Sequence, residues 1–287
     1  MARAFLKLAP DVPGLDALGA RELDDLFAEP PRTVTAARSR RAGSRFVVPL
    51  PGTPDDAGLQ HEKPRGAGTG LLHVERFGRG GMSGLSARFT HPRSTSLAAR
   101  AWNLACHLQA HGVATPQLVA LAERGASLFG AESVLVTREL EGFVSLREFL
   151  RTTDKRSERR RALHSLALTL VQIERCGAWL PATSADNVMV QRDDEDCVAI
   201  KIVNLHSEQA LLRERGLARS RLPSVALTCL AGGSIRTSMS ASEREAWLVA
   251  LAREIGGSLS RRERLELLVR LGFTRQRAAA LAARCQN

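Results

Sequence analysis

The sequence predicts an α+β fold with two lobes, a small sheet-rich N-terminal lobe and a larger helical C-terminal lobe. Three observations carry this prediction. Segments that alternate apolar and polar residues, as strands do, gather within residues 32–139. Apolar residues at helical spacing are clearest in the second half of the chain, over residues 157–176. The chain has 287 residues, which is enough for two lobes with a buried core.

These patterns divide the chain into an N-terminal helical extension over residues 1–31, an N-terminal lobe over 32–139 and a C-terminal lobe over 140–287. The extension has apolar residues at roughly helical spacing, namely Leu15, Leu18, Leu23 and Phe27. Pro30 and Pro31 are expected to end this segment, because proline disrupts the interior of a helix.

The N-terminal lobe is predicted to hold five strands and one helix. The strand-like segments are RTVTAA (32–37), SRFVVPLPG (44–52), LLHVERF (71–77), VATPQLVALAERG (113–125) and SVLVTRELEG (133–142). The first two flank a polar loop, Arg38–Ser44. Residues 94–112 carry apolar residues on one helical face, and Gly112 marks the end of this predicted helix.

The C-terminal lobe is predicted to be mostly helical around one β-hairpin. SLREFL (145–150) begins a helix, and residues 157–176 form the clearest amphipathic helix of the chain. The acidic turn DDED (193–196) joins two apolar strands, VMVQR and CVAIKIV. Residues 241–285 are predicted to be mainly helical.

The composition is basic, with 41 Lys and Arg against 30 Asp and Glu, a formal net charge of +11. A basic surface favours nucleic acid, phosphate groups or anionic lipid. The basic residues are spread along the chain, however, and no nucleic-acid-binding motif accompanies them. A compositional bias of the genome explains such a charge, so we expect no nucleic-acid partner. A basic anion- or nucleic-acid-binding protein remains as a second alternative function.

Cysteine usage and hydropathy exclude several classes of protein. The five cysteines are scattered and lack C-x-x-C spacing, so neither a zinc site nor a disulfide framework is indicated. No segment approaches the run of about 18 apolar residues that a membrane helix needs. Pro10 and Pro13 interrupt the N-terminus before a signal-type apolar region develops. We therefore expect a cytoplasmic protein without a transmembrane segment.

Residues 180–190, LPATSADNVMV, lie between a predicted helix and an apolar strand, a layout similar to the catalytic loop of kinases. Five segments in collinear order together resemble the Kdo/WaaP lipopolysaccharide kinase family, a bacterial branch of the protein-kinase-like fold. They are HVERFGRGG, ARAWNLACHLQAHGVATPQLVALAERG, SVLVTRELEGFVSLREFL, LPATSADNVMV and AIKIVNLHSE. The resemblance implies a bilobal protein-kinase-like fold over about residues 32–215, in a family of ATP-dependent phosphotransferases.

Phosphoryl transfer depends on charges placed around the phosphates, beginning with a Lys that a Glu holds in position. The resemblance puts Glu75 at the Lys position and Ala101 at the position of the Glu partner. Between Arg76 and Ala122 the sequence contains no Asp or Glu. A carboxylate at Glu75 would repel phosphates, unless its side chain points to solvent, which is the alternative interpretation.

The catalytic and metal-binding positions also differ from the family pattern. The resemblance puts Leu180 at the His position, Ala182 at the position of the proton-accepting Asp and Asn204 at that of the metal-binding Asp. Mg²⁺ affinity should fall sharply without this carboxylate, because hard cations prefer carboxylate ligands. Asn187 is retained, and it and Asp186 are the remaining metal candidates, although shaping the turn is the simpler role for both.

The polar loop between the first two strands offers candidate nucleotide- or anion-binding residues. They are Arg38, Arg40, Arg41, Gly43 and Arg45. One glycine makes a poor backbone cradle for phosphates, but guanidinium groups can bind an anion directly.

The sequence therefore predicts a pseudokinase, a kinase-like binding or regulatory module with no catalytic residues, no metal and no cofactor. Its partner would be an active kinase, another protein, or an anionic sugar-phosphate or lipopolysaccharide precursor, and peripheral attachment to the inner membrane is an alternative location. The alternative function is a divergent ATP-dependent phosphotransferase on a sugar or lipopolysaccharide. It would need ATP, Mg²⁺ and substitute groups such as Arg79, Asp186 and His206.

Overall fold

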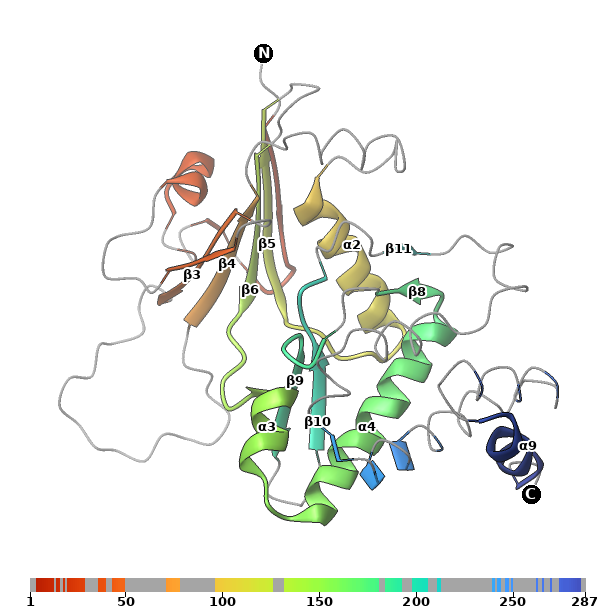
Figure 1. Ribbon diagram of the computed structural model, residues 1–287. Helices are drawn as coiled ribbons and strands as arrows, with labels where there is room; N and C mark the ends of the chain where they lie inside the picture. The colour runs from red at the N-terminus through yellow and green to blue at the C-terminus, as the bar shows by residue number, and fades with distance from the viewer. Residues whose placement is uncertain are drawn as a thin grey trace. The chain divides into compact units, whose positions relative to one another are not determined.

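The structure is a computed structural model that forms two compact units (Figure 1). The first comprises Met1–Ala105 and Pro116–Glu141, and the second comprises Cys106–Thr115 and Gly142–Asn287. The structure describes residues 4–12, 14–15, 18, 20–28, 36–39, 43–49, 71–77, 96–125, 132–180, 184–192, 198–205, 211–212, 239–240, 242–243, 246–247, 249, 262, 265, 269 and 274–284.

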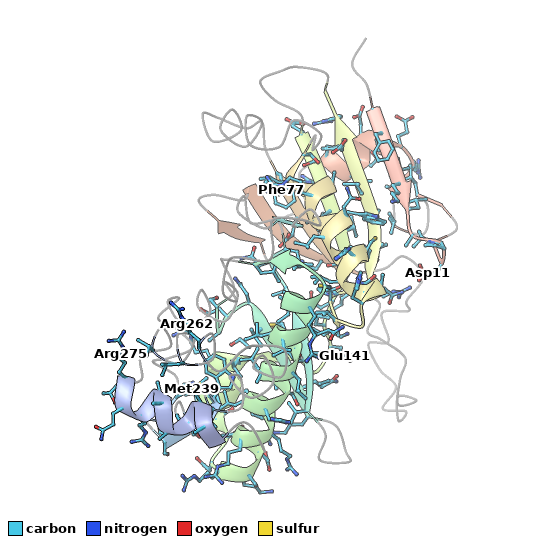
Figure 2. The ribbon with its side chains drawn as sticks, turned by 90° about the vertical axis from the view of Figure 1, so that its right-hand side faces the viewer. Asp11, Phe77, Glu141, Met239, Arg262 and Arg275 are labelled. Carbon is cyan, nitrogen blue, oxygen red and sulfur yellow. The ribbon has the colours of Figure 1, made fainter. Side chains whose placement is uncertain are left out.

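A six-stranded antiparallel sheet forms the first unit. Its strands are β1 (Ala4–Leu8), β2 (Ala36–Ser39), β3 (Gly43–Pro49), β4 (Leu71–Phe77), β5 (Leu118–Arg124) and β6 (Glu132–Arg138). Their spatial order is β1-β5-β6-β4-β3-β2, so the first strand of the chain lies beside the fifth. Figure 2 shows the side chains, with Phe77 at the end of β4.

One face of this sheet packs on the N-terminal segment. The buried core there consists of Leu72, Val74, Val119, Ala120, Ala122, Val134 and Val136 from the sheet and Leu18, Ala20 and Leu26 from the segment. The N-terminal helical extension expected over residues 1–31 is only partly helical. The segment contributes β1, which pairs with β5, and the short 3-10 helix η2 (Leu23–Phe27). Leu18 and Leu26 are buried, and Leu15 and Leu23 are partly buried, because they cover the sheet.

Helix α2 (Leu97–Ala110) contacts the opposite face of the sheet through its first turns. Ser96 Oγ donates to the Glu123 carboxylate on β5. The Lys7 ammonium on β1 lies 5.2 Å from the ring centroid of Trp102. Lys7 and Glu123 are both on the face of the sheet that is opposite to the N-terminal segment, because alternate strand residues point to opposite faces.

The last turn of α2 belongs to the second unit. The His107 ring donates from Nε2 to the Cys176 carbonyl, 2.8 Å away. The helix ends at Gly112, whose φ of 76° is the left-handed conformation that glycine adopts readily. The N–H of Val113 then donates back to the Leu108 carbonyl at 2.9 Å.

The second unit contains helices and two small sheets. Its elements are β7 (Val144–Ser145), α3 (Leu146–Thr152), α4 (Arg156–Arg175), β8 (Ala178–Trp179), β9 (Val188–Arg192), β10 (Val198–Ile202), β11 (Leu211–Leu212) and α9 (Arg275–Arg284). Strands β10, β9 and β7 form a three-stranded antiparallel sheet, and α4 packs against β10. Ser145 caps α3, because its Oγ accepts from the Glu148 N–H at 3.2 Å.

The α+β class is confirmed, as are α2, α3, α4 and the strands of the β9–β10 hairpin. The polar loop Arg38–Ser44 is shorter than predicted, because β2 extends to Ser39 and β3 begins at Gly43. Of the predicted C-terminal helices, α9 and isolated helical positions from 242 onward lie within the described residues. Among the described residues, no helix is both long enough and apolar enough to cross a membrane.

Candidate functional site

Glu75 lies near the end of β4 and is 7% exposed. The strand register pairs it with Leu135 on β6, and Leu135 with Leu121 on β5. Leu121 in turn pairs with Lys7, so Glu75 is on the same face of the sheet as the contact with α2. The interpretation that Glu75 points to solvent is therefore wrong. Glu75 is not without a partner in the folded protein.

Arg76 does not lie on the face of the sheet that Glu75 occupies. It pairs with Val134, a member of the core beneath the N-terminal segment, so its side chain leaves the sheet on the side opposite to Glu75. On α2, Ala101 is fully buried and contributes only a methyl group. The sequence of α2 contains no carboxylate that could orient a cation. The described residues of β4 and α2 therefore form no Lys–Glu pair.

Two asparagines lie at one end of the β9–β10 hairpin. The last ladder pair is Val188 with Ile202, and the N–H of Val203 then donates to the Asn187 carbonyl at 2.9 Å. Asn204 follows Val203 in sequence. This hydrogen bond therefore brings Asn204 next to the turn that precedes β9. Asn204 has a φ of 64°, a conformation that asparagine tolerates better than most residues. The two positions to which the family resemblance assigns metal ligands are therefore adjacent, and both carry neutral amides.

The neighbouring Asp186 is held by Arg147, the second residue of α3. The guanidinium donates from Nε to Oδ1 at 2.6 Å and from Nη2 to Oδ2 at 2.8 Å. The Arg147 N–H also donates to the Ala185 carbonyl at 3.2 Å. These hydrogen bonds keep the pKa of Asp186 below its usual value. Both carboxylate oxygens thus already have a cationic partner, which weakens Asp186 as a metal ligand.

The described residues contain no group of three His, Cys, Asp or Glu side chains that could hold a metal ion. Leu180, at the position where the family resemblance puts a histidine, is buried and 4% exposed, so it belongs to the core. Ala182, Arg40, Arg41, Arg79 and His206 lie outside the described residues.

The remaining candidate residues for anion binding are placed only by the strand register. Arg38 lies on β2 opposite Ser44, and Gly43 begins β3 opposite Ser39. Arg45, also on β3, lies opposite Glu75 on β4. One of the predicted arginines therefore lies at the same register position as Glu75.

The sequence prediction missed Lys201 on β10. Its Nζ lies 4.7 Å from the ring centroid of Phe143, just before β7. The Lys201 side chain is half-buried, whereas its two neighbours in sequence, Ile200 and Ile202, are buried. The alternation of apolar and other residues in VAIKI could have predicted this position. In a strand it places Lys201 on the face opposite to the two isoleucines.

Comparisons with known proteins give a family and a structural neighbour. The family model described as "Lipopolysaccharide kinase (Kdo/WaaP) family" matches residues 70–221, more than half of the chain. No match was found among curated proteins. A solved structure described as "WaaP in complex with acyl carrier protein" is similar at 18% sequence identity and a TM-score of 0.49, covering 98% of this chain and 96% of that chain.

Proposed function

The chain belongs to the Kdo/WaaP lipopolysaccharide kinase family, and we propose that it is a non-catalytic member, a pseudokinase that serves as a binding or regulatory module. The observation that carries this proposal is the burial of Glu75 on the face of the sheet that α2 contacts. The family resemblance puts the phosphate-binding lysine at this position. A carboxylate there opposes a phosphate by about 4 kcal/mol at 4 Å and an effective dielectric constant near 20.

The second unit supports the same proposal. Asn187 and Asn204 offer amide oxygens where Mg²⁺ prefers carboxylates. The nearest carboxylate in the turn, that of Asp186, is bound through both oxygens by Arg147. A Mg²⁺ ion would have to compete with this guanidinium. We therefore expect weak metal binding and no requirement for ATP or Mg²⁺ as cofactors.

The alternative remains a divergent phosphotransferase on a sugar or lipopolysaccharide. It would have to use Asp186, together with Arg79 and His206. The ion pair with Arg147 argues against Asp186 as a base, because it favours the charged form and lowers the basicity of the carboxylate. As a non-catalytic protein, the chain would bind an active kinase or another protein partner, or an anionic sugar-phosphate or lipopolysaccharide precursor.

The proposal is tested by a thermal-shift titration of the full chain with ATP, with and without Mg²⁺ or Mn²⁺, and by an assay of phosphate release. We expect no metal-dependent shift and no turnover. A matched variant restores the family residues by Glu75→Lys, Ala182→Asp and Asn204→Asp, and should gain metal-dependent nucleotide binding if it folds. Steady ATP turnover by the unmodified chain that Asn187→Ala abolishes would disprove the proposal.

A further inference from the structure

Two histidine rings lie close together at the C-terminal end of α2. His107 is in the last turn of this helix, and His111 directly follows its last residue. The ring centroids are 4.3 Å apart, and the ring planes make an angle of 38°. His107 is half-buried and His111 is exposed, and both belong to the second unit. Neither histidine is at a position that the family resemblance assigns to catalysis or to metal binding.

Each ring donates from one nitrogen to a backbone carbonyl. His107 Nε2 lies 2.8 Å from the Cys176 carbonyl oxygen, and His111 Nδ1 lies 2.8 Å from the His107 carbonyl oxygen. A carbonyl oxygen only accepts, so these two nitrogens carry the protons of the neutral rings. The other nitrogens, Nδ1 of His107 and Nε2 of His111, each keep a lone pair. Histidines that bind metal ions show the same arrangement, with the second ring N–H donated to a carbonyl or a carboxylate.

The backbone around the two rings favours a positive charge. The last carbonyls of an α-helix have no partner within the helix, and they give its C-terminus a partial negative charge. In α2 the His107 carbonyl is one of these groups, and the Gln172 side chain donates to the next one, that of His111, at 2.8 Å. The Cys176 carbonyl directly follows Arg175, the last residue of α4. The C-terminal ends of two helices therefore meet at the two imidazoles.

We propose that His107 and His111 together bind a divalent transition-metal ion such as Zn²⁺ or Cu²⁺, with water at the remaining coordination positions. Imidazole nitrogens suit these ions, whereas Mg²⁺ prefers oxygen ligands, so the site is distinct from the metal site of a kinase. Zn²⁺ binds histidine nitrogen at about 2.0–2.1 Å, which allows one ion to contact two rings this close together. The inference does not depend on the proposed function.

The expected consequence is a firmer attachment of α2 to α4. The ion would hold the His107 ring in the orientation that donates to the Cys176 carbonyl. An ion that binds the folded chain and not the unfolded chain raises the melting temperature. Two protein ligands are fewer than the four of a structural zinc site, so EDTA should remove the ion readily.

The test measures Zn²⁺ binding to the full chain, without an added polyhistidine tag, by isothermal titration calorimetry. We expect one ion for each chain and a rise in melting temperature that EDTA reverses. His111→Gln and His107→Gln should each weaken binding by at least about tenfold, because each removes one of two ligands. With Cu²⁺ as the probe, electron paramagnetic resonance should detect two coordinated imidazoles in the unmodified chain and one in His111→Gln.

His164→Gln is the matched control, because His164 is an exposed histidine on α4 in the same unit. Cys106→Ser is a second control, since Cys106 is an exposed thiol beside His107. Both variants should bind Zn²⁺ as the unmodified chain does. Circular dichroism and unfolding without metal establish that each variant folds, and the exposed His111 keeps the test available if His107→Gln does not fold. The inference is overturned if no Zn²⁺ binds, if His111→Gln binds as tightly as the unmodified chain, or if either control variant loses binding.

Discussion

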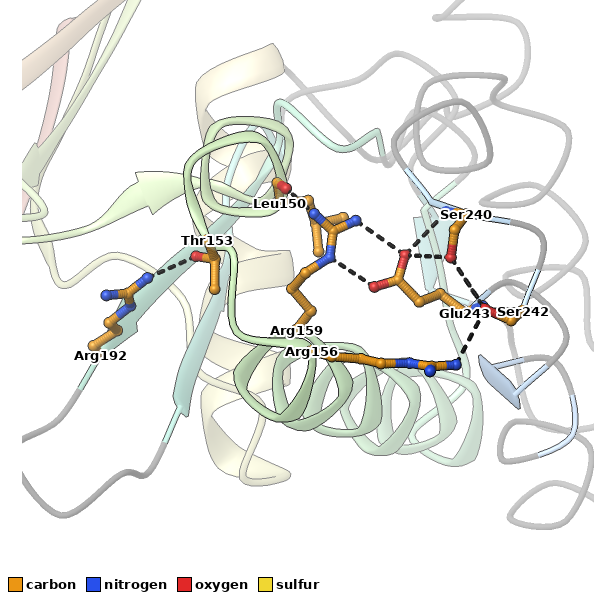
Figure 3. Close-up of polar contacts among 8 residues, drawn as sticks. All are labelled: Leu150, Thr153, Arg156, Arg159, Arg192, Ser240, Ser242 and Glu243. Atoms are coloured by element: carbon orange, nitrogen blue, oxygen red, sulfur yellow. Dashed lines mark hydrogen bonds and ion pairs between the residues drawn. The ribbon is translucent and has the colours of Figure 1, made fainter.

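Arg159 and Glu243 form a two-bond ion pair that joins α4 to the segment around residue 240 (Figure 3). Arg159 Nε lies 2.6 Å from Oε1, and Nη2 lies 3.0 Å from Oε2. The Ser240 hydroxyl and N–H both donate to the same carboxylate, and Arg159 also donates to the Leu150 carbonyl. The pair is largely buried, with 5% of the Glu243 side chain exposed, so it fixes the positions of three segments within the second unit.

Glu243→Gln should lower the free energy of unfolding by about 3 kcal/mol at pH 7, because it leaves a largely buried guanidinium without its counter-charge. Denaturant unfolding of the full chain measures this change. Glu148→Gln is the control, since Glu148 pairs with Arg151 at an exposed position and its loss should leave stability nearly unchanged. Equal losses for the two variants would contradict this account.

The same pair predicts a dependence of stability on pH. The hydrogen bond from the Arg159 guanidinium lowers the pKa of Glu243 from 4.5 to about 2 in the folded protein. The folded state therefore binds this proton less readily than the unfolded state. The stabilisation is fully present above pH 4.5 and is lost as the pH falls through about 2. Unfolding curves between pH 6 and pH 2 should show the stability difference between the unmodified chain and Glu243→Gln shrinking over this range.

Arg147→Met should return the pKa of Asp186 toward its usual value, because the hydrogen bonds from the guanidinium are what lower it. NMR titration of the side-chain carboxyl carbon of Asp186 measures the shift. Arg151→Met is the matched control, since Arg151 bonds Glu148 on the same helix and not Asp186. An unchanged Asp186 titration in Arg147→Met would show that the ion pair does not persist in solution.

The stability of variants at position 204 should depend on how well each residue type tolerates the left-handed backbone conformation of Asn204. Asn204→Ala is expected to cost about 1 kcal/mol of stability, because a Cβ without a local hydrogen-bonding group is disfavoured at a φ of 64°. Asn204→Gly and Asn204→Asp should be tolerated, since both residue types enter this region. Melting temperatures of the three variants test this order, and Asn204→Ala should be the least stable.

Gly142 and Gly112 both have positive φ, at 74° and 76°. A Cβ at Gly112 would meet nothing within 4 Å, whereas one at Gly142 would lie 2.8 Å from the side-chain nitrogen of Gln191. Gly112→Ala should therefore cost about 1 kcal/mol from the backbone alone. Gly142→Ala should cost more, because the amide of Gln191 must also move. Denaturant unfolding compares the two, and a larger loss for Gly112→Ala would refute the close approach.

Much of the local structure could be predicted because one face of each element is buried. The helical spacing of residues 157–176 predicts α4 correctly, and the two apolar segments on either side of DDED predict the paired strands β9 and β10. The DDED turn itself (193–196) lies outside the described residues. The strand β1 was missed. Its five residues form a strand by pairing with β5, more than a hundred residues later, and no local pattern reports such a partner.

The sequence by itself determined the α+β class, most of the helices and strands, and the absence of lysine and aspartate from positions that the family resemblance assigns to catalysis. The tertiary structure decided what the replacements do. It buried Glu75 on the face of the sheet that α2 contacts, paired Arg147 with Asp186 and placed Lys201 over Phe143. Periodicity along the chain shows which face of an element is apolar. It does not show which distant residues that face will contact. Those contacts depend on how segments far apart in the sequence pack together, and no local pattern predicts this packing.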